Sequence, residues 1–179
     1  YNRFARDAGL TDDQVVDNLI FTGVKVGDLM ENAMPKEEAK VWFGAAPPDL
    51  TLIARARGVD WLYTYLRTFY LDDSRPYGVN NAVFPNVGMP HVLWELQGWQ
   101  EPVLETLTDE EGNQHEIVAD FKLVSDGSLS PVEFDRAMRD LVNFLAYIAE
   151  PIRLEREALG IKVLIFLLVM IVVFYLLKK

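Results

Sequence analysis

The chain has 179 residues, half of them hydrophobic, and a formal net charge of −10. This length predicts one domain with at most a small appendage. There is no cysteine, which excludes disulfide bonds, a cysteine-based zinc site and a catalytic thiolate. Residues 1–157 carry 14 basic and 27 acidic side chains, a net charge of −13, so this part repels nucleic acid and attracts basic partners.

The N-terminal segment predicts short helices with an irregular stretch between them. The chain begins at Tyr1 without an initiator methionine, which predicts a processed or truncated product. Residues 11–14, Thr-Asp-Asp-Gln, have the spacing of a capping box and predict the start of a helix. Residues 21–29 hold two glycines and should be irregular. Pro35 predicts the first turn of a helix over residues 36–43.

Residues 44–49 form a proline-rich connector, and Asp49 is expected to cap a helix that ends at Gly58. Arg55 and Arg57 lie on this otherwise apolar helix. We therefore expect either that at least one arginine meets a buried or partly buried anion, or that both make surface salt bridges.

The next predicted helix covers residues 61–71, with Asp60 as its cap. It is densely aromatic, and its rings are Trp61, Tyr63, Tyr65, Phe69 and Tyr70. Such a helix forms either an ordinary part of the core or the wall of a site for a flat cofactor.

Residues 72–99 predict a long ordered loop, and loops of this length in compact domains are usually functional or disordered. Its centre, residues 84–91, reads Phe-Pro-Asn-Val-Gly-Met-Pro-His. Pro90 pushes Met89 towards an extended conformation, and Gly88 can take backbone angles closed to other residues. A thioether held in this way either fills a gap in the core or binds a soft metal or haem iron.

Residues 103–124 predict a β-hairpin with its turn at residues 110–113, as a surface insertion without chemistry of its own. Residues 130–133, Ser-Pro-Val-Glu, predict a strong helix start. Pro151 predicts either a kink in that helix or its end. The face expected to pack on the rest of the domain is Phe134, Met138, Leu141, Leu145 and Ile148.

The C-terminal segment predicts a membrane span. Residues 163–177 are all apolar, and extension back to Ala158 gives twenty residues interrupted only by Gly160 and Lys162. Twenty helical residues cover roughly 30 Å, the thickness of the hydrocarbon core of a bilayer. The lysines at residues 178–179 favour a cytoplasmic C-terminus, which would place the acidic head in the periplasm of a bacterium.

No other chemistry is indicated by motif. The sequence has no phosphate-binding loop and no nucleophile motif, so a soluble enzyme with a hydrophobic C-terminal helix has nothing to support it. The acidic runs at residues 12–13, 72–73 and 109–111 are expected to be solvated surface charges and not metal sites.

Four segments occur in an order that is typical of one family. They are Gly-Ala-Ala-Pro-Pro-Asp-Leu at residues 44–50 with Arg-Ala-Arg at 55–57, Asp-Trp at 60–61, Phe-Pro and Val-Gly-Met-Pro within 84–90, and the C-terminal helix with its glutamate-proline and span. In these segments the chain resembles the cytochrome c₁ family, the haem subunit of ubiquinol–cytochrome c reductase. The resemblance covers most of residues 40–179 and is poor in the hairpin.

The resemblance implies a haem c whose iron takes Met89 as an axial ligand. It implies that Arg57 pairs with a haem propionate, and that Trp61, where the family often has tyrosine, donates its indole N–H to the propionate. The other cofactor-binding residues that it implies are Ala45, Pro47, Pro48, Ile53, Phe84, Val87 and Pro90.

The family attaches haem through Cys-x-x-Cys-His, and its histidine is the second axial ligand. This motif is absent from residues 1–179, although residues 1–4 resemble those that follow shortly after it. We therefore expect either that the N-terminal attachment segment, with the histidine ligand, lies outside this sequence, or that the product lacks covalent haem.

Together these features predict a mainly α protein. We expect a cytochrome-c-like helical head over residues 1–157, a small β-hairpin insertion at about residues 101–125, and one C-terminal transmembrane helix over residues 158–179. The head would lie in the periplasm, anchored to the bacterial inner membrane.

The resemblance implies an electron-transfer subunit of the respiratory quinol–cytochrome c oxidoreductase, with no catalysis by side chains. It would pass electrons from a Rieske iron–sulfur protein to a basic cytochrome c or another acceptor. It would work beside cytochrome b in a dimeric complex, without nucleic acid. The alternative is a cofactor-free, membrane-anchored periplasmic assembly or binding protein.

Overall fold

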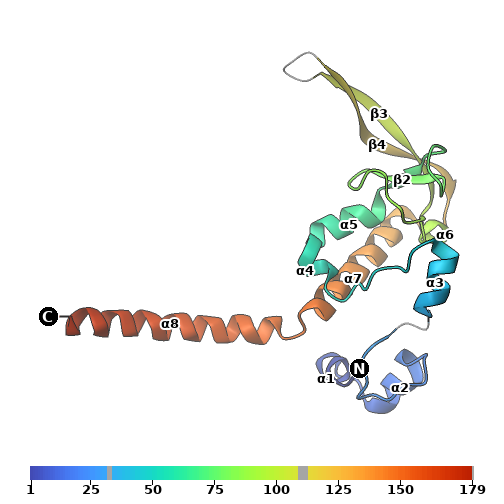
Figure 1. The fold of residues 1–179 in the computed structure, drawn as a ribbon. Helices are drawn as coiled ribbons and strands as arrows, with labels where there is room; N and C mark the ends of the chain where they lie inside the picture. The colour runs from blue at the N-terminus through green and yellow to red at the C-terminus, as the bar shows by residue number, and fades with distance from the viewer. Residues whose placement is uncertain (32–33, 109–112, 179) are drawn as a thin grey trace. The chain divides into compact units, whose positions relative to one another are not determined.

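The computed structural model describes residues 1–31, 34–108 and 113–178, and Figure 1 shows its helices and strands. The chain divides into two compact units, Tyr1–Pro48 and Asp49–Lys179. About half of the chain is helical, and the described strands form two small two-stranded sheets. A mainly helical fold is therefore confirmed.

The first unit contains α1 (Asn2–Ala8), α2 (Asp12–Leu19) and α3 (Lys36–Phe43). The predicted capping box is present, since Thr11 Oγ1 accepts from the Gln14 amide at 3.3 Å and Gln14 Oε1 from the Thr11 amide at 3.0 Å. The bounds of α3 agree with the prediction. Helix α1 was not predicted, because residues 2–8 show no clear apolar period.

Helix α4 (Ile53–Arg57) ends at Gly58, as predicted. The expectation that Asp49 caps it is wrong. Asp49 Oδ1 accepts from the Thr51 amide at 2.7 Å, which closes a turn ahead of the helix. Asp49 lies too early in the chain to reach the free N–H groups of α4.

Helix α5 (Val59–Arg67) begins directly after Gly58, so Asp60 lies in its first turn and is not its cap. A carboxylate in the first turn still stabilises the helix, because it lies near the positive end of the helix dipole. The helix ends earlier than predicted, and Phe69–Leu71 forms strand β1, which pairs antiparallel with β2 (Val79–Asn81). The predicted loop over residues 72–99 therefore contains a strand.

The hairpin is confirmed and is longer than predicted. Strands β3 (Gly98–Thr108) and β4 (Gln114–Asp126) pair antiparallel from Gly98↔Asp126 to Thr108↔Gln114, with irregularities at Trp99/Gln100 and Val103/Leu104. A short helix, α6 (Trp94–Gln97), leads into β3. Of the predicted turn at residues 110–113, residues 110–112 lie outside the described residues.

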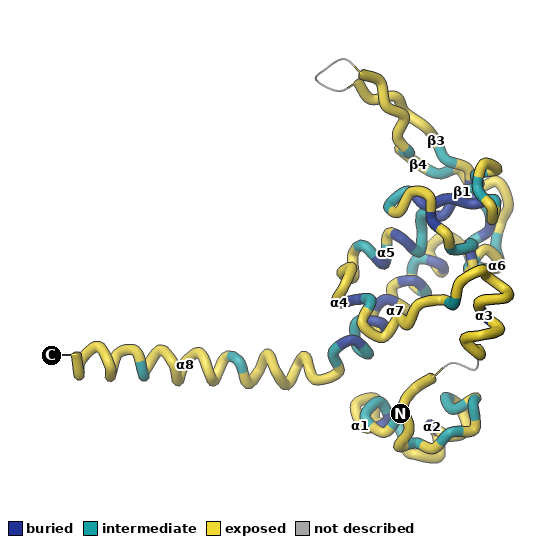
Figure 2. The backbone as a smooth tube through the Cα atoms, in the orientation of Figure 1, coloured by how far each residue is buried: buried dark blue, intermediate teal, exposed yellow. Residues whose placement is uncertain are grey.

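Helix α7 (Pro131–Ala149) has the predicted capping box at Ser130 and ends before Pro151. Its buried face is Phe134, Met138, Val142, Leu145 and Ala149. Leu141 was placed on this face and is 36% exposed, so Val142 takes its position. Helices α4 and α5 pack on α7, and the buried residues gather there and along β1 and β2 (Figure 2).

Helix α8 (Arg153–Leu177) is long and apolar enough to cross a membrane, and it is the one such helix among the described residues. None of its residues is buried, as Figure 2 also shows. Its apolar side chains therefore require another apolar environment, which agrees with the predicted span.

Candidate functional site

Met89 lies against the aromatic helix α5. Its Sδ accepts a hydrogen bond from the Tyr65 hydroxyl, with 3.2 Å between the two atoms. Burial raises the pKa of Tyr65, so this hydroxyl remains protonated and acts as a donor at neutral pH. Met89 is partly buried and packs on a core cluster that contains Tyr65, Phe69 and Val87. The sulfur therefore has a defined position and a polar partner.

Three aromatic rings form a continuous group beside this sulfur. The Trp61 ring stacks on Tyr65, with centroids 4.8 Å apart and an interplanar angle of 11°. Phe84 meets the edges of both rings, at 6.3 Å from Trp61 and 6.5 Å from Tyr65. Trp61 also borders the cluster between α4, α5 and α7, to which Ile53 belongs. The aromatic helix thus contributes both to the core and to a wall beside Met89.

Arg57 lies at the outer end of this wall. Its guanidinium carbon is 5.1 Å from the centroid of Trp61 and 5.7 Å from that of Phe84, a cation–π arrangement. Arg55 and Arg57 are both exposed, and neither makes an ion pair within the part of the chain that the structure describes. The expected surface salt bridge is therefore not formed among the described residues, and the alternative, a buried or partly buried anion, stays a prediction. Arg57 is held over rings beside Met89.

Asn80 and Asn81 hold the loop before Met89. Asn81 is fully buried, and its Oδ1 accepts from the amides of Val83 at 3.1 Å and Phe84 at 3.2 Å. Asn80 Oδ1 accepts from the amides of Asn81 at 2.9 Å and Asn86 at 2.8 Å. Two buried side chains thus satisfy four backbone donors. Sequence analysis missed both, although adjacent asparagines within an apolar segment were a signal of such a role.

The turn that presents Met89 depends on Asn86. Its φ is 62°, in the left-handed region that asparagine adopts more readily than most residues. Gly88 can take backbone angles closed to other residues but does not use them here, because its φ lies outside that region. The turn lies at residues 85–86, ahead of Met89.

His91 is a buried residue that the sequence did not single out. Its ring stacks on Phe69 with 5.0 Å between centroids and 3° between planes, and meets the edge of Trp99. Burial lowers the pKa of His91 to about 4, opposed in part by the nearby Gln97 side chain. Neither ring nitrogen makes a hydrogen bond of good geometry. His91 is therefore neutral at pH 7 and packs as an aromatic ring.

The structure brings together five predicted site residues, namely Arg57, Trp61, Phe84, Val87 and Met89. Ile53 joins them through the cluster that Trp61 borders, and Pro90 is half-buried next to Met89. The other three, Ala45, Pro47 and Pro48, belong to the first unit, where all three are exposed.

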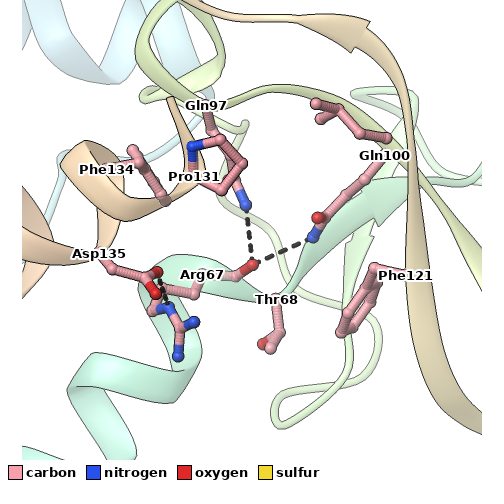
Figure 3. Close-up of a pocket in the computed structure, with 9 residues that line it drawn as sticks. Arg67, Thr68, Gln97, Gln100, Phe121, Pro131, Phe134 and Asp135 are labelled. Carbon is pink, nitrogen blue, oxygen red and sulfur yellow. Dashed lines mark hydrogen bonds and ion pairs between the residues drawn. The ribbon is translucent and has the colours of Figure 1, made fainter. Parts of the chain in front are cut away.

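A cavity of about 350 Å³ lies elsewhere in the second unit (Figure 3). No predicted site residue lines it. Its polar groups largely satisfy one another, since Gln97 and Gln100 donate to the Arg67 carbonyl at 2.9 and 3.0 Å, and Arg67 pairs with Asp135 at 2.6 Å. These bonds join the base of the hairpin to α5 and α7, so the cavity marks a structural junction.

The chemistry of the donor set agrees with one side of a haem site. No group of three or more histidine, cysteine, aspartate or glutamate side chains that could hold a metal occurs in the described residues, so a multidentate metal centre is not indicated there. Met89 supplies one soft thioether donor, the type of ligand that haem iron accepts. Arg57 supplies a cation on an aromatic face, and the surrounding rings supply apolar contact.

The cytochrome C1 family model matches residues 4–179 of this chain. Cytochrome c1 of Allochromatium vinosum is 53% identical over 179 residues, all of this chain and 72% of that protein. The ammonia monooxygenase gamma subunit of Nitrosomonas europaea is 51% identical, over all of this chain and 72% of that protein. Mitochondrial cytochrome c1 of Saccharomyces cerevisiae is 30% identical over 80% of this chain and 41% of its own length.

These comparisons define the class as a c-type cytochrome with an electron-transfer role in a respiratory complex. The chain belongs to the cytochrome c₁ family. Membership of that family implies a c-type haem, and proteins of the family form one complex with cytochrome b and a Rieske protein. The family resemblance expected from the sequence is thus confirmed.

Proposed function

We propose that this chain is the electron-transfer subunit of a quinol–cytochrome c oxidoreductase, taking electrons from a Rieske iron–sulfur protein and passing them to a basic cytochrome c. One observation carries the proposal. Tyr65 contacts the Met89 sulfur and the rings of Trp61 and Phe84, and the Arg57 guanidinium lies over those two rings.

A bound c-type haem would supply one iron that gains a single electron and then loses it. For this chain, Met89 would donate its thioether sulfur to the iron, and a methionine ligand favours a high potential. Arg57 would pair with a propionate. Trp61 and Phe84 would exclude water from the edge of the site. The two cysteines of a haem c would have to come from outside residues 1–179, which contain none.

The proposed arrangement in the cell follows from charge and hydropathy. A head of residues 1–157 would face the periplasm, with residues 158–179 as the anchor and the C-terminal lysines in the cytoplasm. The net charge of −13 on the head would attract a basic acceptor and speed encounter. The complex would be dimeric. Side chains of this subunit would carry no bond-making chemistry.

The test uses membrane protein purified after expression of the full-length gene. A reduced c-type haem spectrum is expected, and Met89→Leu should lower the midpoint potential. Met138→Leu is the matched control, because Met138 is a buried methionine of α7 that lies outside the site. Absence of a haem spectrum would instead support a cofactor-free membrane protein, and an unchanged potential in Met89→Leu would remove Met89 as the ligand.

The acceptor can be tested separately. Electron transfer to a basic soluble cytochrome c should slow as ionic strength rises, because salt screens the attraction between the acidic head and its partner. An acidic cytochrome c of similar potential is the control. A rate that does not depend on salt with either acceptor would contradict the electrostatic part of the proposal.

A further inference from the structure

Tyr65 carries a hydroxyl group to which the proposed function assigns no role. Tyr65 is 9% exposed, and its ring is fixed between the stacked Trp61 and the edge of Phe69. The hydroxyl donates to Met89 Sδ at 3.2 Å. Buried hydroxyl groups almost always have a partner, and the recorded partner of this one is the sulfur.

The backbone of Tyr65 is held as firmly as its ring. Its carbonyl oxygen accepts from the side-chain amide of Asn81 at 2.8 Å. Asn81 also binds the loop that leads to Met89, through the amides of Val83 and Phe84. The donor and the acceptor of the O–H···S bond are therefore anchored to one buried side chain, which keeps their separation constant.

We propose that Tyr65 is a positioning residue for Met89, and that its hydroxyl sets the donor strength of the Met89 sulfur towards iron. This inference rests on the proposed function. A thioether sulfur has two lone pairs, so one can accept the Tyr65 proton while the other faces a metal. The hydrogen bond draws electron density from the sulfur, which makes it a poorer donor to ferric iron. The reduced state is favoured and the midpoint potential rises.

The experiment compares Tyr65→Phe with Tyr63→Phe in the haem-loaded, full-length protein. Both changes remove one hydroxyl from α5 and keep the ring, but Tyr63 faces Arg67, whose guanidinium carbon lies 4.6 Å from its centroid. Tyr65→Phe should lower the midpoint potential, changing the equilibrium constant for electron exchange about two- to tenfold, the range expected of one neutral hydrogen bond. Its methionine-to-iron charge-transfer band should also shift. Tyr63→Phe should change neither.

The outcomes separate this inference from the proposed function. If the wild-type protein shows no methionine–iron band, the proposed function fails and this inference with it. If the band is present but Tyr65→Phe and Tyr63→Phe give the same potential and band, the inference alone is overturned.

A second measurement needs no variant. In the ferrous wild-type protein, NMR should show contact between a slowly exchanging Tyr65 hydroxyl proton and the Met89 methyl group. Absence of that contact would overturn the inference even if Tyr65→Phe failed to load haem.

Discussion

Asn81 donates a hydrogen bond of 2.8 Å from its side-chain amide to the carbonyl oxygen of Tyr65. This bond joins the last turn of α5 to the end of β2, directly before the loop that carries Met89. The Tyr65 carbonyl lies in the last turn of the helix, where its one backbone donor is the Thr68 amide at 3.4 Å, so it has room for a second donor. The Asn81 side chain therefore binds both the C-terminal end of α5 and the loop that leads to Met89.

We expect Asn81→Ala to lower the free energy of unfolding by at least about 2 kcal/mol, since it leaves several buried backbone groups without partners. Chemical denaturation of the haem-loaded protein in detergent measures this. Asn143→Ala is the control, because Asn143 lies on the exposed face of α7. Equal stability of the two variants would show that Asn81 does not hold the loop.

Asp72 accepts a hydrogen bond from Asn80, the neighbour of Asn81, and its carboxyl group makes stability depend on pH. Hydrogen bonds from Ser74 and Asn80 lower the pKa of the Asp72 carboxyl. A carboxyl whose pKa is lower in the folded than in the unfolded state contributes stability above its unfolded pKa, and this is lost as the pH falls through the folded pKa. The urea midpoint of the wild type should therefore fall in acid.

Asp72→Asn should lose the stability that the ionised Asp72 carboxylate contributes. Its urea midpoint should therefore fall less steeply in acid than that of the wild type. Asp73→Asn removes a charge from the adjacent, exposed residue and should keep the wild-type slope. If both variants follow the wild-type curve between neutral and acidic pH, the side-chain bonds of Asp72 contribute nothing to stability.

Arg57→Gln should lower the midpoint potential, because loss of a cation near the site favours the ferric state. The change in equilibrium constant should be roughly two- to fivefold, as for a partly exposed charge interaction. Arg55→Gln on the same short helix makes the same change in net charge without the contacts to Trp61 and Phe84. Redox titration of both separates a local effect from one of overall charge, which would lower both potentials alike.

Arginine at both Leu167 and Leu168 should prevent membrane insertion of α8. An arginine at the centre of a spanning helix costs about 2.5–3.5 kcal/mol on insertion scales. The insertion cost of two arginines is therefore difficult for the remaining apolar residues to offset. The double variant should become extractable by alkaline carbonate, whereas a double alanine variant should remain in the membrane fraction. Retention of the double arginine variant would indicate that α8 is not a spanning segment.

Local signals in the sequence predicted the helix starts well. The capping boxes at Thr11 and Ser130 and the proline before α3 lie where the sequence placed them, because caps depend on contacts within four residues. The assignment of a cap to Asp60 failed because α5 begins earlier, directly after Gly58, and the assignment to Asp49 failed because its side chain closes a turn. A short polar side chain can serve a turn as readily as a helix end, and the sequence does not show which one forms.

Long-range relationships were predicted less well. The end of α5 was set too late because residues 69–71 pair with residues 79–81, and strand pairing depends on a partner distant in the chain. Asn81 was overlooked for the same reason. Its role comes from burial and from bonds to residues on both sides of it, which no residue type or spacing displays by itself.

By itself, the sequence determined the helical class and the apolar C-terminal segment, because these follow from composition and periodicity, and its resemblance to one family implied Met89 as the candidate ligand. Only the tertiary structure decided that Tyr65 is the hydrogen-bond donor to the Met89 sulfur and that Arg57 lies over Trp61 and Phe84. It also decided that Asn81 joins α5 to the loop before Met89. These relationships join side chains from separate segments, and packing fixes their distances only once the chain has folded.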